Sequence, residues 1–265
     1  PSLKKQLKQL KDSLYSNIFE RQADEWAMFY SHLGGYKTIH IADKVLQSVY
    51  EHFDLPEKIY GYPDLSERKT IVQASIQKMN LLLQRYEMAN LCLMARNFDL
   101  SIKIYDAILK EGFKSSEIYN NLGVGYLLNV IQNDSIFQKY EWPIFIDSKS
   151  KLASNSSTRD IFGIDVTAYL NNAIYYFELA LRDKDYRNAH LNIAIAYLLK
   201  EISLENQDSD NLLEFNNYLN KAKNANVSRV KTLEGIFAHY SGKIEESKNL
   251  LLSDSEICPI SKRNF

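Results

Sequence analysis

The sequence predicts an all-α protein built largely from paired helices, and three observations lead to this fold class. Apolar residues recur at helical spacing along most of the 265-residue chain. Glycine and proline are scarce, with 9 and 5 copies, whereas 18 Tyr and 12 Phe supply bulky apolar side chains. This composition suits long helices better than many tight turns. Segments in the second half also align with one another, which indicates repeated helix pairs.

Composition and charge exclude several classes of function. The chain is 45% hydrophobic and 25% charged, which is ordinary for a globular protein, and Lys+Arg 32 against Asp+Glu 33 leaves a net charge of -1. Bulk charge therefore selects neither nucleic acid nor an acidic membrane surface. No apolar run is long enough to predict a membrane span. Cys92 and Cys258 form neither a disulfide framework nor a cysteine-rich zinc site.

The first third of the chain is predicted to form three helices and a loop. Residues 2–16 space leucines three and four apart among lysines, which is typical of a helix with one narrow apolar stripe. A second helix begins near residue 19 and stops at the glycine pair 34–35. A third runs over 38–52, and residues 54–65 form a loop because two prolines and a glycine interrupt the pattern. The stripe of the first helix is Leu3, Leu7, Leu10 and Leu14, and the apolar side of the third is Ile41, Val45, Val49 and Phe53.

From residue 66 onward the helical pattern resumes and repeats. Segment 117–128 aligns with 188–199, and segment 98–109 aligns with 170–181. A further copy covers 233–252, with Gly242 in its turn. Small residues recur where two helices would cross, because closely spaced helices cannot both present large side chains there. The matched positions are Asn121 and Asn192, Gly123 and Ala194, Gly125 and Ala196, Tyr126 and Tyr197, Ser101 and Ala173, and Tyr105 and Phe177, with Gly235 and Ser247 in the further copy.

In these small and large positions the chain resembles a tetratricopeptide repeat array. The resemblance implies an α-solenoid of about four helix pairs, each about 34 residues long, stacked into a curved binding surface. On this basis residues 1–70 form a short helical segment. Residues 71–265 form the repeat-like array, with a long insert at about 130–166.

The insert has two halves of different composition. Its first half is rich in aromatic residues and should pack against the protein, since leaving that apolar area in water is costly. Its second half, near 154–158, is rich in Ser and Asn and should be mobile. Three outcomes stay open: the first half fills the groove of the array, forms one wall of a pocket, or only adds surface. Residues 205–211 are expected to be a plain exposed loop. The aromatic residues are Phe137, Tyr140, Trp142 and Phe145.

The resemblance also implies a mostly apolar concave groove that binds a protein or peptide. One branch of the family clamps a peptide carboxylate with Lys, Asn and Arg, and Asn90 and Asn121 match its two asparagines. Tyr86 stands in place of the first Lys and Asn192 in place of an Arg, so carboxylate capture is poorly supported. The groove residues would be Asn90, Glu117, Asn120, Asn121, Val124, Leu127, Leu128, Asn188, Leu191, Asn192, Ile195, Leu198 and Leu199.

Residues 1–70 contain an acidic pair, Glu20 and Asp24, which lies on one face of a helix because the residues are four apart. Such a pair is usually solvated surface. Here it is followed by a Gly-Tyr pair at 35–36 and by Tyr-Pro-x-x-x-x-Arg at 62–68. In that order the pieces resemble the C-terminal part of the HtpX-like zinc metallopeptidases, which carry E-x-x-A-D, a G-Y turn and H-P-x-x-x-x-R. Some members continue into tetratricopeptide repeats.

This second resemblance implies a role for each acidic residue. Glu20 would be the third zinc ligand, and Asp24 would orient a ligating histidine. The other ligands and the general base lie on an H-E-x-x-H helix upstream, which this chain lacks, and Tyr62 replaces the usual His. We therefore expect no catalytic residue and no cofactor in this chain alone, and zinc only in a longer parent protein. The five histidines, none in an H-x-x-x-H pair, are His32, His40, His52, His190 and His239.

The expected function is binding of proteins or peptides by a repeat scaffold. The scaffold would be the C-terminal region of a larger zinc metallopeptidase and would present substrates or assembly partners to it. The alternative is a stand-alone interaction adaptor with no peptidase connection. The first residue is Pro1 and no signal-peptide pattern follows, so we expect a piece of a longer protein. The peptidase resemblance implies a bacterial envelope or periplasmic location, and without it the cytoplasm is favoured.

Overall fold

The structure is a computed structural model that describes residues 3–33, 36, 39, 41–57, 63–147, 165–182, 186–203, 209–254 and 264. These residues form α-helices, one short 3-10 helix and connecting segments, and no β-strand occurs among them. The prediction of an all-α protein is confirmed.

The chain divides into two compact units, residues 1–85 and 86–265. The division falls inside helix α3 (Leu65–Met94), which also contains the predicted boundary at residue 70. The first unit consists of α1 (Leu3–Leu33), α2 (Ala42–His52) and the first two-thirds of α3.

Helix α1 corrects one prediction, because residues 3–16 and 19–33 belong to one helix rather than two. The predicted break has only Ser16 and Asn17 as weak helix formers. Their cost is below about 1 kcal/mol each, which does not interrupt a helix without Gly or Pro. The side chains of the leucine stripe, the glycine pair 34–35 and Thr38 lie outside the described residues.

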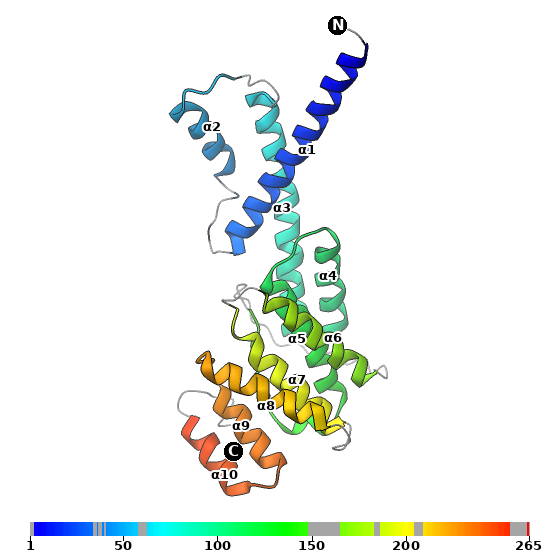
Figure 1. Ribbon diagram of the computed structural model, residues 1–265, viewed down its shortest axis with the longest axis vertical. Coiled ribbons are helices and arrows are strands. Elements are labelled where there is room, and N and C mark those ends of the chain that lie inside the picture. Colours follow the sequence, from blue (N-terminus) through cyan, green and yellow to red (C-terminus); the bar gives the residue numbers. More distant parts are fainter. Residues whose placement is uncertain are drawn as a thin grey trace. The chain divides into compact units, whose positions relative to one another are not determined.

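Helices α1 and α3 run in the same direction (Figure 1). Ion pairs link them at two levels. At one level the Lys78 Nζ contacts the Glu25 Oε2 at 2.6 Å. Phe29 of α1 and Met79 and Leu82 of α3 are fully buried or nearly so. A capping box begins α3: the Glu67 N–H donates to the Asp64 Oδ1 (2.9 Å), and the Asp64 N–H donates to the Glu67 Oε2 (3.0 Å).

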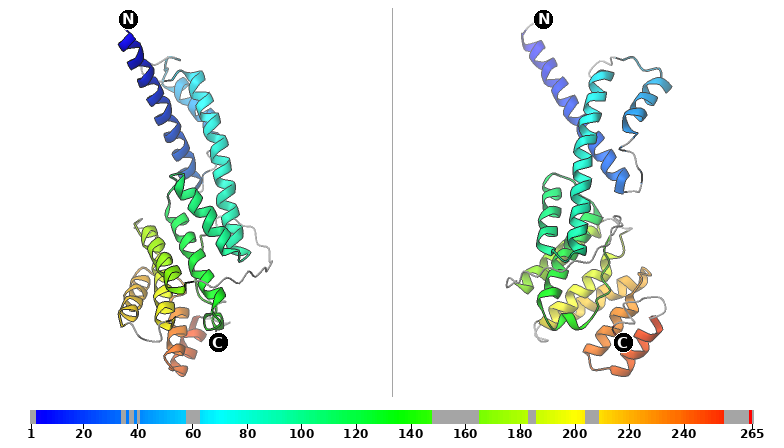
Figure 2. Two further views of the ribbon diagram at one scale, coloured as in Figure 1. Left: turned by 90° about the vertical axis from the view of Figure 1, so that its right-hand side faces the viewer. Right: turned by 180° about the vertical axis from the view of Figure 1, so that it is seen from behind.

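The second unit continues α3 into a series of helices in which each packs against its neighbours in sequence. Figures 1 and 2 show α7 and α8, and α9 and α10, lying side by side. Helix α7 also contacts α5 and α9, two positions away in the chain. The bounds are α4 (Phe98–Lys110), α5 (Ser116–Asn133), η2 (Phe137–Lys139), α6 (Val166–Ala180), α7 (Ala189–Ser203), α8 (Ser209–Asn224), α9 (Val230–Tyr240) and α10 (Ile244–Asp254).

Small residues lie where these helices approach most closely, as the aligned segments predicted. A Cβ placed on Gly123 of α5 would lie 2.7 Å from the Phe177 Cε1 and 3.1 Å from the Ala173 carbonyl oxygen of α6. At the equivalent positions of two other pairs, a serine hydroxyl donates to a carbonyl of the facing helix. These bonds are Ser101 Oγ to Ala89 O (2.9 Å) and Ser247 Oγ to Gly235 O (2.8 Å).

The aromatic half of the insert packs onto the second unit, as predicted. Phe137 and Trp142 are 1% and 6% exposed, and residues 141–147 form an irregular connecting segment. The serine-rich half, including 154–158, lies outside the described residues. One prediction is partly wrong: residues 209–211 are not an exposed loop but the first residues of α8, where Asn211 is buried.

Candidate functional site

Four asparagines that the sequence assigned to the groove meet inside the second unit. Asn90 comes from α3, Asn120 and Asn121 from α5, and Asn192 from α7, and each is at most 2% exposed. A buried carboxamide is costly unless its donors and acceptors are bonded. The partners of these amides therefore define what the site holds.

Three of the amides bind the main chain of residues 141–147. Asn120 donates from its Nδ2 to the Phe145 carbonyl at 3.1 Å, whereas Asn192 and Asn121 each bind one residue through both a donor and an acceptor. Asn192 donates from its Nδ2 to the Phe145 carbonyl and accepts from the Phe145 N–H, both at 2.9 Å. Asn121 makes the same two bonds to Asp147: its Nδ2 donates to the Asp147 carbonyl at 3.0 Å, and its Oδ1 accepts from the Asp147 N–H at 2.9 Å. Each amide thus satisfies both polar groups of one residue, as a neighbouring strand would. Phe145 and Asp147 can be paired from the same edge because the N–H and C=O groups of alternate residues in an extended chain point to the same edge.

A third pair of this kind lies at the start of the segment. The Asn264 Nδ2 donates to the Glu141 carbonyl, and the Glu141 N–H donates to the Asn264 Oδ1, both at 2.7 Å. The sequence analysis did not identify Asn264. No local pattern marks it, because its partner lies 123 residues earlier.

Further bonds connect the asparagines to each other, although the buried Asn90 Nδ2 has no hydrogen-bond partner. The Asn120 Nδ2 donates to the Asn121 Oδ1 at 3.2 Å. The Asn192 Nδ2 also donates to the Asn120 Oδ1 (2.9 Å), and the Asn121 Nδ2 donates to the Asn90 Oδ1 (2.9 Å). The Tyr105 hydroxyl donates to the same Asn90 oxygen. Burial raises the pKa of Tyr105 well above its usual value, which keeps this hydroxyl a donor. The site is a continuous polar network in an apolar surrounding.

Side chains that lie between the paired residues Glu141 and Phe145 also anchor the segment. Trp142 and Ile144 are 6% and 8% exposed, and the indole N–H of Trp142 donates to the Phe137 carbonyl at 2.8 Å. Arg229 donates from Nη1 to the Ile144 carbonyl at 3.3 Å. Burying a tryptophan and an isoleucine stabilises the segment by several kcal/mol, at about 1.5–3 kcal/mol per large side chain.

Most of the other predicted groove residues are buried in this structure. Their burial follows from their place on the inner sides of α5 and α7, where neighbouring helices and the insert pack. Leu128, Glu117 and Asn188 are partly exposed. The buried ones are Val124, Leu127, Leu191, Ile195, Leu198 and Leu199.

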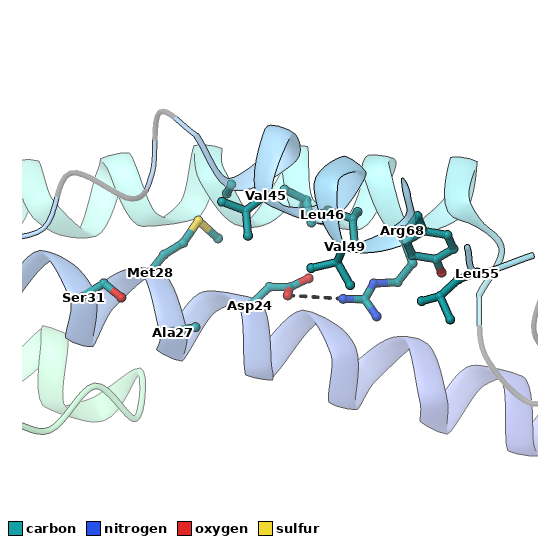
Figure 3. Close-up of a pocket in the computed structure, with 12 residues that line it drawn as sticks. Asp24, Ala27, Met28, Ser31, Val45, Leu46, Val49, Leu55 and Arg68 are labelled. Atoms are coloured by element: carbon teal, nitrogen blue, oxygen red, sulfur yellow. Dashed lines mark ion pairs between the residues drawn. The ribbon is translucent and has the colours of Figure 1, made fainter. Parts of the chain in front are cut away.

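In the first unit, the acidic pair and the predicted arginine come together. The Arg68 Nη1 contacts the Glu20 Oε2 at 2.6 Å, and its Nη2 lies 3.6 Å from the Asp24 Oδ1 (Figure 3). All three side chains are only 17% to 21% exposed. Burial raises the pKa of Asp24, and the Arg68 guanidinium offsets part of that rise. Two pieces of the peptidase-like pattern, far apart in sequence, thus share one polar cluster.

The residues of this cluster do not fit a zinc site by themselves. The Glu20 oxygen that would ligate zinc already pairs with a guanidinium, and a cation beside Arg68 would be repelled. Among the residues that the structure describes, no group of three or more His, Cys, Asp or Glu side chains is placed to hold a metal ion.

A cavity of about 530 Å³ opens beside this cluster, between helices of the first unit. Its walls are mainly apolar, and Asp24 and Arg68 form its polar end (Figure 3). The lining residues of α1 are Asp24, Ala27, Met28 and Ser31. The cavity is also lined by residues that come after α1 in the chain: Ala42, Val45, Leu46, Val49, Tyr50, Leu55, Arg68 and Val72.

Comparison of the chain with protein-family models, curated proteins and solved structures gives no match. No helix within the described residues is long and apolar enough to cross a membrane.

Proposed function

We propose that the second unit is a tetratricopeptide-type interaction module that holds extended peptide segments through their main chain. The paired amides of Asn121 and Asn192 carry this proposal. Each offers one donor and one acceptor at the spacing of a peptide group, and together they bind alternate residues of segment 141–147.

The order of the helices supports the tetratricopeptide-type arrangement. Helices α5 and α6, α7 and α8, and α9 and α10 pack as consecutive pairs, and α6 packs on α7 between pairs. Gly123 and Gly235 are the small residues at two of the crossings. Each pair then buries its apolar side against its neighbours, as in a solenoid.

In this function the insert occupies the groove as an internal ligand. A partner segment of similar chemistry competes with it. A tethered segment acts at an effective concentration of about millimolar, so an external peptide binds much more weakly while the insert is in place.

The test uses the full chain with residues 141–147 replaced by a Gly-Ser linker of equal length. A labelled peptide of residues 137–147 is titrated in by fluorescence anisotropy, after circular dichroism has verified helix content. We expect saturable binding to the linker variant and at least about 100-fold weaker binding to the wild type. Adding Asn121→Ala and Asn192→Ala to the folded linker variant should abolish binding. Binding that is unchanged by these substitutions, or absent from the folded linker variant, would refute the proposal.

A second candidate function concerns the first unit, as the end of a zinc metallopeptidase domain to which the module presents substrates or partners. The pairing of Arg68 with Glu20 and Asp24 favours it, because these residues come from two separate pieces of the peptidase-like pattern. To ligate zinc in a longer parent protein, the Glu20 carboxylate would have to break its ion pair with Arg68. The proposal requires an H-E-x-x-H helix encoded before Pro1, and zinc analysis of that longer protein tests it. If the zinc content of its Glu20→Ala variant equals that of the unsubstituted protein, the peptidase hypothesis is refuted and the stand-alone adaptor remains.

A further inference from the structure

Tyr186, which precedes α7 in the chain, contacts two side chains of segment 141–147. Its ring meets the ring of Phe145 edge to face, with the centroids 6.5 Å apart and an angle of 76° between the ring planes. Its hydroxyl donates to the Asp147 Oδ2 at 3.4 Å. Side chains two residues apart in an extended chain point to the same side, so a single tyrosine can contact both.

Further hydrogen-bond donors are buried beside this contact. Tyr86 and Asn90 of α3 are 3% and 2% exposed, and the Tyr86 hydroxyl and the Asn90 Nδ2 have no hydrogen-bond partner. Asn121 connects them to the segment, because its Nδ2 donates both to the Asn90 Oδ1 (2.9 Å) and to the Asp147 carbonyl (3.0 Å). Unpaired buried donors are costly, so this end of the groove favours a ligand that brings acceptors.

The Asp147 carboxylate acts electrostatically on two of these tyrosines. Burial raises the pKa of both Tyr86 and Tyr186, and the negative charge of Asp147 raises it further. Glu117 has the same effect on both, but a smaller one. Both hydroxyls therefore stay protonated at neutral pH and remain donors. A carboxylate offers acceptors only, and its bonds to such donors are stronger than those of a neutral group.

We propose that the groove of the second unit selects extended segments in which an aromatic residue is followed, two positions later, by an acidic residue, as Phe145 is followed by Asp147. This inference rests on the proposed function and names the class of peptide that the groove binds. Asn121 and Asn192 bind the main chain whatever its sequence. Tyr186 supplies the selection, because its ring contacts the aromatic side chain and its hydroxyl contacts the carboxylate.

Peptides of residues 137–147 that end in a C-terminal amide test the proposal. They are titrated by fluorescence anisotropy into the full chain in which a Gly-Ser linker replaces residues 141–147. One peptide exchanges Ile146 and Asp147, which keeps composition and charge but moves the carboxylate to the other side of the extended chain. It should bind at least about tenfold more weakly than the unsubstituted peptide, because a bond to a charged acceptor is lost.

An Asp147→Asn peptide should also bind about tenfold more weakly, since it keeps the shape of the side chain and removes its charge. Gln138→Lys is the matched control, because it changes the net charge of the peptide by the same amount at an exposed residue. This control should leave the affinity unchanged.

Tyr186→Phe in the linker variant identifies the residue that recognises the acid. It keeps the ring and removes the hydroxyl, so it should weaken binding of the unsubstituted peptide about tenfold and leave binding of the Asp147→Asn peptide unchanged. Equal affinity for the unsubstituted, exchanged and Asp147→Asn peptides would overturn this inference and leave the proposed function intact. An unchanged affinity of Tyr186→Phe for the unsubstituted peptide would overturn it as well. If no peptide binds the folded linker variant, the proposed function itself is wrong, and this inference with it.

Discussion

Replacing Gly123 by Ala should destabilise the second unit although it improves helix propensity. The added methyl would lie 2.7 Å and 2.8 Å from two ring atoms of Phe177 and 3.1 Å from the Ala173 carbonyl oxygen. Phe177 is completely buried, so its ring moves only if its neighbours move as well. Overpacking of this kind costs about 1–3 kcal/mol, and Ala regains about 0.8–1 kcal/mol over Gly in a helix. We expect a net loss of up to about 2 kcal/mol.

Gly125 of the same helix is the matched control. A methyl there would meet the Ile102 Cγ1 at 3.0 Å, and this flexible, partly exposed side chain can turn away. Gly125→Ala should therefore change the free energy of unfolding by less than about 0.5 kcal/mol, because propensity gain and crowding nearly cancel.

Urea unfolding of the full chain measures both variants. In a Trp26→Phe background, Trp142 is the single remaining tryptophan of the 2 in the sequence, and its fluorescence reports on the second unit. Adding Phe177→Leu to Gly123→Ala should recover part of the loss, giving a coupling energy of about 0.5–1 kcal/mol. Equal stability of the Gly123→Ala and Gly125→Ala variants would refute the assigned close approach.

Three further predictions concern other parts of the chain. Asn192→Ala removes the acceptor of the Phe145 N–H and one of the two amide donors to its carbonyl, while Asn120 keeps the other, a loss of about 1–3 kcal/mol; amide hydrogen exchange at Phe145 should accelerate by about 10–100-fold, and an unchanged rate would contradict the pairing. Burial raises the pKa of Asp24 above 3.8, so the folded state binds this proton more tightly than the unfolded chain. Its stabilising contribution is present below about pH 3.8 and is lost as the pH rises through the raised pKa; Asp24→Asn should flatten this part of the stability–pH curve from chemical denaturation. Burial also raises the pKa of the Cys92 thiol, which is 7% exposed, so in a Cys258→Ser variant it should react with a disulfide reagent only after unfolding.

Periodicity predicted most of the helices because it depends on residues three and four apart. The segments 98–109, 117–128, 170–181 and 188–199 fall within or almost within α4, α5, α6 and α7. The predicted break near residue 17 was wrong because weak helix formers alone do not end a helix that can continue on both sides.

The candidate site was predicted only in part. Asn90 and Asn121 were placed in the groove by alignment, and Asn192 was noted as a departure from an expected arginine. Its pairing with Phe145, 47 residues earlier, depends on how the insert returns across α5 and α7. Local sequence carries no signal for such a contact, which is also why Asn264 was missed. Likewise, Ile41, Val45, Val49 and Phe53 were predicted to share a side of a helix, but their exposure to solvent could not be read from spacing.

Under the proposed function, the asparagine pairs act as an interrupted edge strand and decide which chains bind in the groove. A carboxamide contacts only the main chain, so it does not discriminate among side chains, with one exception. Proline has no N–H to donate, so it is excluded wherever an amide must be satisfied. The insert fits this restriction. The residues paired with asparagine amides are Glu141, Phe145 and Asp147, and Pro143 lies between the first two of them. Tolerance of sequence and intolerance of misplaced proline therefore arise from the same three side chains.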